Sequence, residues 1–201
     1  MSQRKTVDIL RQQVGYDGFF KLSKFRLRHS LFNGSMSREM SRELFERGHA
    51  VAMLPYDPQR DELVLLEQFR IGALHDPNGP WLTEIVAGMI KDDERAEDVA
   101  RREALEEAGC EINSLVHILN YYVSPGGTSE TIALYCGLID SSLVKEGIYG
   151  LDEENEDIRV FKVSYDQAIH WLRSGKINSA APIIALQWLM MNREQLRQQS
   201  G

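Results

Sequence analysis

Residues 88–110 read GMIKDDERAEDVARREALEEAGC, and this stretch decides how the chain can fold and what it can bind. Alanine recurs at every fourth position within it, at residues 96, 100, 104 and 108. Four residues turn an α-helix by slightly more than one full turn, so the alanines form one slowly drifting stripe. Such a stripe lets a helix backbone lie close to a sheet. We therefore predict a helix over residues 98–108, with Asp92 or Asp93 as its N-cap and Gly109 as the left-handed residue after it.

Three glutamates share one side of this predicted helix. Glu103 and Glu107 are four residues apart, and Glu106 lies three residues from Glu103. Like charges at these spacings cost about a few tenths of a kcal/mol per pair, so a compensating partner is expected. A divalent cation such as Mg²⁺, which prefers oxygen ligands, fits that role. The alternative is a solvated acidic face with ion pairs to Arg101 and Arg102.

The spacing of the fixed residues favours the first interpretation. Glu94 follows Gly88 after five intervening residues, and Arg102-Glu103-Ala104 follows after seven more. One residue later comes Glu106-Glu107, and one residue after that comes Gly109-Cys110. This arrangement matches the Nudix signature at every fixed position. The chain therefore resembles the Nudix superfamily of hydrolases.

The resemblance implies a fold class, a reaction and a metal centre. Nudix hydrolases have an α/β (α+β) fold, an α/β/α sandwich around a mixed sheet, and they hydrolyse a nucleoside diphosphate linked to another group. Mg²⁺, for which Mn²⁺ can substitute, is held by the loop–helix–loop. Carried over by position, Arg102 orients the glutamates, the catalytic Glu106 is either a third metal ligand or a residue that supports the ligands, and Gly88 allows a close approach. The implied metal ligands are the backbone carbonyl of Ala87 and the side chains of Glu103, Glu107 and Glu156.

Sequence beyond this box narrows the resemblance. Pro125 lies fifteen residues beyond Cys110, within SPGGTSE at residues 124–130. A proline at this distance is typical of the ADP-ribose pyrophosphatase subgroup. Further stretches are similar to bacterial members of that subgroup: GFF (18–20), SRELFERGHAVAMLP (41–55), EQFR (67–70), EIVAGMI (84–90), ENEDIRV (154–160) and IALQWL (184–189).

An acidic loop at residues 151–157 is implied to supply the base that activates water. Alignment on the ENEDI run points to Glu154 as this base, with Glu156 as the metal contact and Glu153 as the alternative base. A carboxylate on such a loop can take the proton of an already acidified water at the moment of attack. Without the resemblance, these residues indicate only a solvated acidic loop.

The residues at substrate-pocket positions of the family are spread along the chain. Adenine needs an aromatic surface, and phosphates need arginine. The implied set is Phe19, Phe20, Arg42, Glu43, Arg47, Arg70, Met89, Ser124, Gly126 and Glu130. The first four are implied to come from the partner subunit of a homodimer with exchanged N-terminal segments. Ordinary surface ion pairs and strand packing remain the alternative for each arginine and phenylalanine.

Composition limits the setting in which such an enzyme works. The 201 residues carry a formal net charge of −7, which disfavours general binding to nucleic acid or to anionic membranes. Cys110 and Cys136 have no metal-ligand spacing and suit a reducing, cytoplasmic setting. We expect no signal peptide in residues 1–10 and no membrane span in residues 177–192, where polar residues interrupt the apolar ones.

Two regions are expected: a small β-rich accessory and dimerisation module over residues 1–47, and the Nudix domain over residues 48–201. Apolar runs and turn residues predict the elements, and their order is not the simple alternation of a Rossmann sheet. Strands are expected at 19–28, 36–46 (extended or mixed), 50–56, 63–69, 81–86, 112–123, 131–139 and 158–163, and further helices at 165–174 and 180–198.

The combined prediction is Mg²⁺-dependent hydrolysis of ADP-ribose to AMP and ribose 5-phosphate. Two alternatives stay open: a Nudix hydrolase of another sugar nucleotide such as GDP-mannose, and a non-catalytic module that binds a nucleotide. Modules of the second kind usually lose box glutamates, whereas Glu103, Glu106 and Glu107 are all present here.

Overall fold

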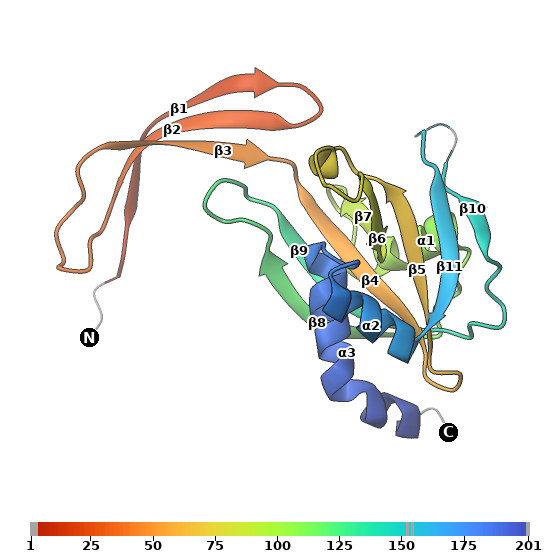
Figure 1. The fold of residues 1–201 in the computed structure, drawn as a ribbon. Coiled ribbons are helices and arrows are strands. Elements are labelled where there is room, and N and C mark those ends of the chain that lie inside the picture. Colours follow the sequence, from red (N-terminus) through yellow and green to blue (C-terminus); the bar gives the residue numbers. More distant parts are fainter. Residues whose placement is uncertain (1–3, 152, 154, 200–201) are drawn as a thin grey trace. The chain divides into compact units, whose positions relative to one another are not determined.

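The computed structural model describes residues 4–151, 153 and 155–199, and the chain divides into two compact units (Figure 1). The first unit holds the residues up to His49 together with Tyr122–Thr131. The second unit holds Ala50–Tyr121 and the residues from Ile132 onward. The division at residues 47 and 48 made from the sequence stays a prediction, and the structure adds a hairpin loop from the middle of the chain to the first unit.

A three-stranded antiparallel sheet forms most of the first unit (Figure 1). Its strands, in the order β1-β2-β3, are β1 (Val7–Asp17), β2 (Lys21–His29) and β3 (Met40–Glu46). The expected strand at 19–28 corresponds to β2. The extended region expected from residue 36 becomes a strand only at Met40, with an isolated bridge between Ser30 and Met36 before it. Strand β1 was not predicted, because register shifts after Ile9 and Val14 interrupt the alternation of its apolar residues, all of which are exposed.

A mixed sheet forms the second unit. Among the described residues it has eight strands, six of them in the order β10-β11-β5-β4-β9-β8, with β6 paired to β5 and β7 to β4. Strand β4 pairs parallel with β9 and antiparallel with β5, so the predicted mixed sheet is confirmed. The strands are β4 (His49–Asp57), β5 (Glu62–Phe69), β6 (Trp81–Glu84), β7 (Val86–Ile90), β8 (Ser114–Tyr122), β9 (Thr131–Leu138), β10 (Gly147–Tyr149) and β11 (Ile158–Ser164).

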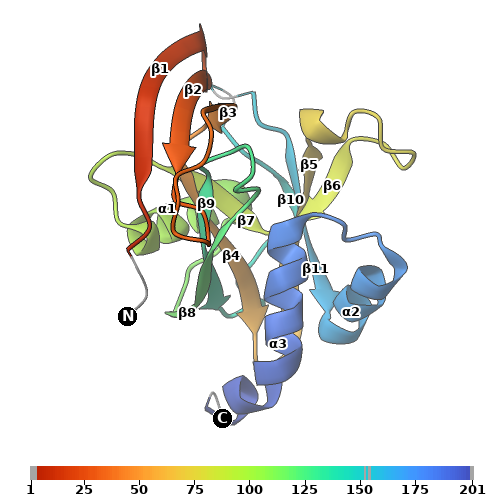
Figure 2. The same ribbon diagram turned by 90° about the vertical axis from the view of Figure 1, so that its left-hand side faces the viewer.

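Helices cover both faces of this mixed sheet (Figure 2). They are α1 (Ala96–Ala108) on one face and α2 (Tyr165–Ser174) and α3 (Ala180–Gln199) on the other. Along β4, Leu54 and Tyr56 pack in the core with α2 and α3, whereas Val51 and Met53 pack in the core with α1. Because both faces are covered, the central strands are continuous apolar runs. The predicted α/β/α sandwich is confirmed.

Three local predictions were wrong. The single strand expected at 81–86 is two strands, β6 and β7, interrupted at Ile85. Helix α1 begins at Ala96 rather than at residue 98, and its N-cap residue is Arg95, with no side-chain cap. Asp93 adopts a φ of 69° in the preceding turn and does not cap the helix. Strand β10 was not expected.

None of the helices in the described residues is long and apolar enough to cross a membrane.

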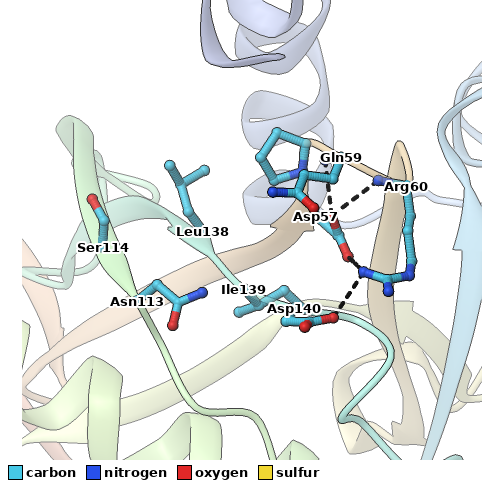
Figure 3. Close-up of a pocket in the computed structure, with 9 residues that line it drawn as sticks. Asp57, Gln59, Arg60, Asn113, Ser114, Leu138, Ile139 and Asp140 are labelled. Atoms are coloured by element: carbon cyan, nitrogen blue, oxygen red, sulfur yellow. Dashed lines mark hydrogen bonds and ion pairs between the residues drawn. The ribbon is translucent and has the colours of Figure 1, made fainter. Parts of the chain in front are cut away.

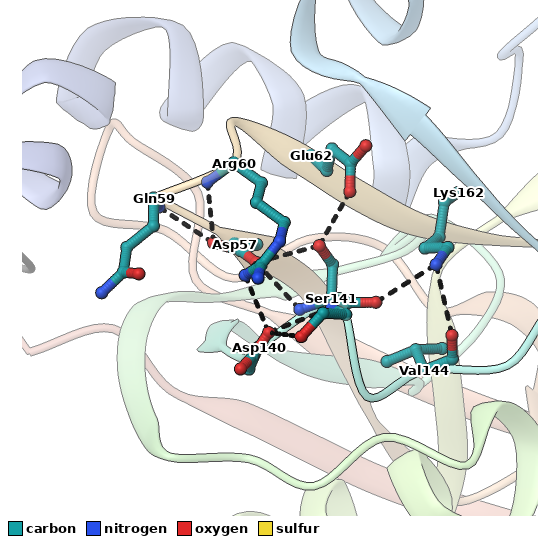
Figure 4. A network of polar contacts seen from close by, with 9 residues as sticks. Asp57, Gln59, Arg60, Glu62, Asp140, Ser141, Val144 and Lys162 are labelled. Atoms are coloured by element: carbon teal, nitrogen blue, oxygen red, sulfur yellow. Dashed lines mark hydrogen bonds and ion pairs between the residues drawn. The ribbon is translucent and has the colours of Figure 1, made fainter.

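A polar network closes one end of the mixed sheet at the β4–β5 turn (Figure 4). The buried Asp57 carboxylate accepts hydrogen bonds from the backbone N–H groups of Gln59 and Arg60, at 2.9 and 3.0 Å. It also accepts from the backbone N–H and the hydroxyl of Ser141, at 2.8 and 2.9 Å. Lys162 donates from the neighbouring strand to two carbonyl groups of the segment after β9. The network therefore ties the β4–β5 turn to the segment after β9, and β11 to that same segment.

Asp57→Asn is expected to lower the free energy of unfolding by about 2–3 kcal/mol, because an amide NH₂ then faces buried donors. Burial acts to raise the pKa of Asp57, but the hydrogen bonds from Arg60 and Ser141 outweigh burial and lower it. The carboxylate therefore stabilises the fold above about pH 4, and this contribution is lost as the pH falls through the lowered pKa. Urea unfolding should show a large deficit at pH 7 and a smaller one at pH 3.

The control for this prediction is Asp140→Asn. Asp140 also pairs with Arg60, at 2.8 Å, but its carboxylate is exposed. Its loss should change stability little. Asp140 also accepts hydrogen bonds from the backbone N–H and the hydroxyl of Ser142, so the two aspartates differ mainly in burial. Equal effects of the two substitutions would contradict the role assigned to burial.

Candidate active site

The contact that organises the candidate site joins β7 to α1. The backbone N–H of Ala87 donates to Oε2 of Glu107 at 2.9 Å, and only 3% of Glu107 is exposed. Ala100, Ala104 and Ala108 of the predicted stripe are fully buried against the sheet. The small side chains thus let α1 approach closely enough for a carboxylate on the helix to reach the strand backbone.

The helix end matches its prediction. Gly109 adopts a left-handed conformation with φ 57°, and its N–H group caps the carbonyls of Ala104 and Leu105. Any Cβ at this position would also crowd the ring of Tyr149, at 2.9 Å. Glycine is therefore required here both for its backbone conformation and for space.

Arg102 holds the more exposed glutamates of α1. Its guanidinium lies 2.9 Å from Oε1 of Glu103 and 2.9 Å from Oε2 of Glu106, and 4.0 Å from Glu94. The alternative of an acidic face paired with Arg101 and Arg102 therefore holds for Arg102 only. Arg101 donates instead to the carbonyl of Ile112. A solvated acidic face does not account for Glu107, which is buried.

Gly88 lets strand β7 lie close to Glu103 of α1. A Cβ built on Gly88 would overlap the carboxyl group of Glu103. The side chain of Glu103 is only 14% exposed, so it has little room to move aside. The tight approach that the resemblance implied at this glycine is therefore present in the structure.

Burial raises the pKa of both carboxyl groups, that of Glu103 to about 7 and that of Glu107 to about 8. The negative charges of neighbouring glutamates, including Glu156, act in the same direction. Arg102 opposes the shift at Glu103, and the N–H group of Ala87 opposes it at Glu107. The structure thus concentrates carboxylates at a place where the protein supplies too little positive charge to compensate them.

This donor set fits a hard divalent cation. A cation would relieve the repulsion among Glu103, Glu107 and Glu156, whose charges act on one another. Within the described residues, no three acidic, histidine or cysteine side chains are already arranged around a metal position. Arg102 and the Ala87 N–H group instead hold the two box carboxylates. Glu156 accepts a hydrogen bond from the backbone of Leu151 at 3.2 Å.

The remaining predicted residues fall into separate places. Arg70 and Met89 lie in the second unit, in the same unit as the box glutamates. Glu154 lies outside the described residues. All the others lie in the first unit: Phe19, Phe20, Arg42, Glu43, Arg47, Ser124, Gly126 and Glu130.

Several first-unit residues contact one another. The guanidinium of Arg47 lies over the ring of Phe20, 4.9 Å from its centroid, and its Nε lies 3.3 Å from the buried carboxylate of Glu130. Phe19 packs edge-on against Phe20 but is 86% exposed. The loop that carries Gly126 is fixed by hydrogen bonds to the backbone of Phe45. Aromatic, cationic and anionic groups therefore meet in this unit, and their assignment to a nucleotide pocket stays a prediction.

A separate cavity of about 240 Å³ lies at the β4–β5 turn (Figure 3). Its lining includes Arg60, Asn113 and Asp140, and no predicted site residue contributes to it. Figure 3 shows the Arg60 guanidinium turned toward Asp57 and Asp140. The charges around the cavity are thus already paired, and we assign it no part in the chemistry.

Comparison with known proteins decides the family. The model of the NUDIX domain matches residues 46–186, which is more than half of the chain. The chain belongs to the Nudix family. Nudix hydrolases generally use a divalent metal ion, in agreement with the carboxylates around Ala87 and Gly88.

Several proteins similar in sequence to this Nudix chain are named as pyrophosphatases. It is 51% identical to the ADP-ribose pyrophosphatase of Escherichia coli over 194 residues, which cover 96% of this chain and 92% of that protein. It is 30% identical to the GDP-mannose pyrophosphatase of Cronobacter sakazakii over 92% of this chain and 95% of that one. A solved structure described as an ADP compounds hydrolase superposes with a TM-score of 0.72 over 98% of both chains at 20% identity, which supports the Nudix fold.

One residue of the Nudix unit was missed from the sequence. Glu84, at the end of β6, accepts a hydrogen bond from Nε of Arg70 at 2.7 Å. The signal available was a carboxylate at the end of an apolar strand. Its partner could not be named, because Arg70 lies fourteen positions earlier in the chain and the sequence does not give the register of the hairpin.

Glu107→Gln is expected to stabilise the metal-free protein at pH 8 while leaving its stability at pH 5 nearly unchanged. The pKa of Glu107 rises from 4.5 to about 8 on folding, so the folded state keeps a proton that the unfolded state loses. Stability therefore falls as the pH rises through this window, and the amide removes that loss. Thermal unfolding in EDTA should show a melting temperature a few degrees higher, roughly 2–4 °C per kcal/mol.

The control for the thermal measurement is Asp98→Asn, an exposed carboxylate in the first turn of α1, which should leave the pH dependence between pH 5 and pH 8 unchanged. A Glu107→Gln protein that melts below the wild type at pH 8 would show that the ionised carboxylate stabilises the fold even without metal.

Proposed function

We propose that this Nudix enzyme hydrolyses ADP-ribose to AMP and ribose 5-phosphate with Mg²⁺, for which Mn²⁺ can substitute. The observation that carries the proposal is the placement of Glu103 and Glu107 against Ala87 and Gly88, in a chain half of whose residues are identical to those of a protein named ADP-ribose pyrophosphatase. The relative named for GDP-mannose is more distant, which favours ADP-ribose over that alternative.

The groups of the second unit suit a diphosphate. Mg²⁺, when bound by Glu103, Glu107, Glu156 and the carbonyl of Ala87, would supply positive charge to the diphosphate and acidify water. Arg102 restrains the carboxyl groups of Glu103 and Glu106 by hydrogen bonds and so fixes their directions. Arg70 supplies a guanidinium on the same unit, which can donate to phosphate oxygens.

The reaction itself needs a base and a leaving group. The water oxygen forms a bond to one phosphorus, and the bridging P–O bond breaks. One product keeps the water oxygen and the other the bridging oxygen. Glu154 is proposed to take the proton of the water, with Glu153 as the alternative. Glu153 lies among the described residues, whereas Glu154 does not.

The first unit is proposed to supply the nucleotide pocket and the dimer contact. Phe19, Phe20, Arg42 and Glu43 would serve the site of the partner subunit. One face of its sheet carries Val7, Ile9 and Val14 of β1, which are about half exposed or more, together with Phe25 and Leu27 of β2. Exposed apolar strands of this length are a liability unless another chain covers them. A second copy of this chain is the proposed cover.

The proposed cellular compartment and the proposed class of partner are those expected from the sequence. The thiols of Cys110 and Cys136 are free and buried, which is compatible with the reducing cytoplasm we propose for this enzyme. The net charge of −7 likewise supports a small-molecule substrate rather than nucleic acid or a membrane surface as its partner.

Glu103→Gln and Glu107→Gln are each expected to lower kcat/KM for ADP-ribose by roughly 100-fold or more, because metal stabilisation of the reaction is worth several kcal/mol. The release of the two phosphomonoester products is measured with Mg²⁺ on ADP-ribose, GDP-mannose and other nucleoside diphosphate sugars. Glu111→Gln, at an exposed position, is the control. A higher kcat/KM for GDP-mannose would overturn the proposed substrate. Tight ADP-ribose binding without turnover by the wild type would instead indicate a non-catalytic module.

Ile9→Lys is expected to convert a dimer to a monomer, because it places a charge on the apolar face of β1. Gln13→Lys is the matched control: it adds the same charge to the same strand, opposite Lys24 on the polar face. Sedimentation velocity measures both masses. A wild-type protein that sediments as a monomer at micromolar concentration would refute the proposed dimer.

A further inference from the structure

The β5–β6 hairpin of the second unit carries a row of polar groups on one face. In the antiparallel register, Leu66 lies opposite Glu84, and Gln68 lies opposite Leu82. Residues that are paired, or two apart on one strand, share a face. Leu66 packs in the core beneath α1, so Glu84 and Gln68 lie on the α1 side of the sheet.

Arg70 extends this row by one step. Its backbone is extended, with φ −130° and ψ 111°, and its N–H group donates to the carbonyl of Pro80 at 2.8 Å. The ladder therefore continues through Arg70, whose side chain shares the face of Gln68. Arg70 lies four positions along the chain from Leu66, the residue opposite Glu84. The two side chains must therefore reach toward each other over the Gln68–Leu82 pair.

The ion pair that results fixes one edge of the guanidinium. Nε of Arg70 donates to Oε2 of Glu84 at 2.7 Å, and Glu84 is largely buried, with 15% of its side chain exposed. Among the described residues, no second carboxylate lies within ion-pair distance of Arg70. Since the guanidinium is planar with its donors in a fixed fork, anchoring Nε also sets the direction of the terminal nitrogens. Arg70 itself is 42% exposed and can meet a ligand there.

This guanidinium is held on the side of the sheet that α1 covers, because its partner Glu84 lies on that face. The positive charge of Arg70 acts on the carboxyl group of Glu107 of α1. In addition, Gln68 is 93% buried on the same face, and its Nε2 has no hydrogen-bond partner among the described residues. An unpaired buried amide costs free energy unless a ligand oxygen completes it. This face of the hairpin is therefore a place where an oxygen-rich ligand fits.

We propose that Glu84 is a positioning residue: by holding Nε of Arg70, it presents the terminal nitrogens of that arginine to the diphosphate of a substrate bound at Glu103 and Glu107. The proposal rests on the proposed function for the identity of the substrate. Glu84 itself does not touch the substrate and acts through Arg70. Bidentate phosphate binding depends on direction as well as charge, so a misdirected guanidinium loses much of its value.

The test is a double-mutant cycle on Arg70→Ala and Glu84→Ala, read by Mg²⁺-dependent ADP affinity in calorimetry and by kcat/KM for ADP-ribose. Glu84→Ala alone should weaken both readouts by roughly 10- to 100-fold. In the Arg70→Ala background it should add less than about twofold, because the arginine that it orients is gone. Glu84→Gln keeps an oxygen acceptor for Nε and should recover at least half of the loss on a logarithmic scale.

A matched control lies on the opposite face of the same strand. Glu67 of β5 pairs with Arg159 at 2.5 Å, in the same kind of ion pair, but on the α2 and α3 side. Glu67→Ala should leave both readouts within about twofold of the wild type. Mn²⁺ affinity, measured by electron paramagnetic resonance, should be unchanged in Glu84→Ala because the metal ligands remain.

The outcomes separate this inference from the proposed function. Equal losses from Glu84→Ala with and without Arg70, or a loss matched by Glu67→Ala, would overturn the positioning role and indicate a general effect on the fold. Coupled ADP affinities together with no turnover of ADP-ribose by the wild type would leave the positioning role intact and refute the proposed substrate. A wild-type protein that binds no ADP in the presence of Mg²⁺ would overturn the inference as well.

Discussion

The hydrogen bond from the Ala87 N–H group to the buried carboxylate of Glu107 is the contact on which the candidate site depends. It requires a helix backbone that lies almost against a strand, and only small side chains between the two permit that distance. The alanine stripe of α1 supplies them on the helix, and Gly88 supplies the space on the strand beside Glu103. A larger residue in the stripe or at residue 88 would separate the carboxylates from the strand backbone.

The same contact lowers the stability of the folded chain while it prepares the carboxylate for its proposed role. Burying Glu107 removes its carboxylate from water, and one backbone donor compensates only part of that cost. The apolar clusters on the two faces of the mixed sheet are large enough to bear this, because β4 and β5 contribute side chains to both. In the proposed function this cost is offset when a divalent cation binds, because its charge compensates the ionised carboxylates. A site with its acidic groups fully solvated would fold more easily but would hold the cation less well.

The sequence predicted the elements whose signals are local. The helix and the grouping of Glu103 with Glu107 follow from periodicity, and the left-handed end follows from Gly109. The sandwich could be expected from apolar runs that are buried on both faces. Strand β1 could not be expected, because register shifts interrupt the alternation of its apolar residues. The start of α1 could not be expected either, because Arg95 leaves no capping signature. Contacts through backbone groups, such as that of Ala87, leave no trace in the side-chain pattern.

Contacts that depend on strand register were equally hidden, and the proposed way of holding the substrate depends on one of them. Arg70 and Glu84 meet because the β5–β6 ladder continues for one residue beyond β5 and places them on one face. A shift of one residue would turn Glu84 toward the opposite side of the sheet, where Glu67 already pairs with Arg159. Of the proposed metal ligands, Glu103 and Glu107 come from a helix whose spacing is visible in the sequence. The proposed direction of the Arg70 guanidinium depends instead on a hairpin register, which the spacing of residues along the chain does not reveal.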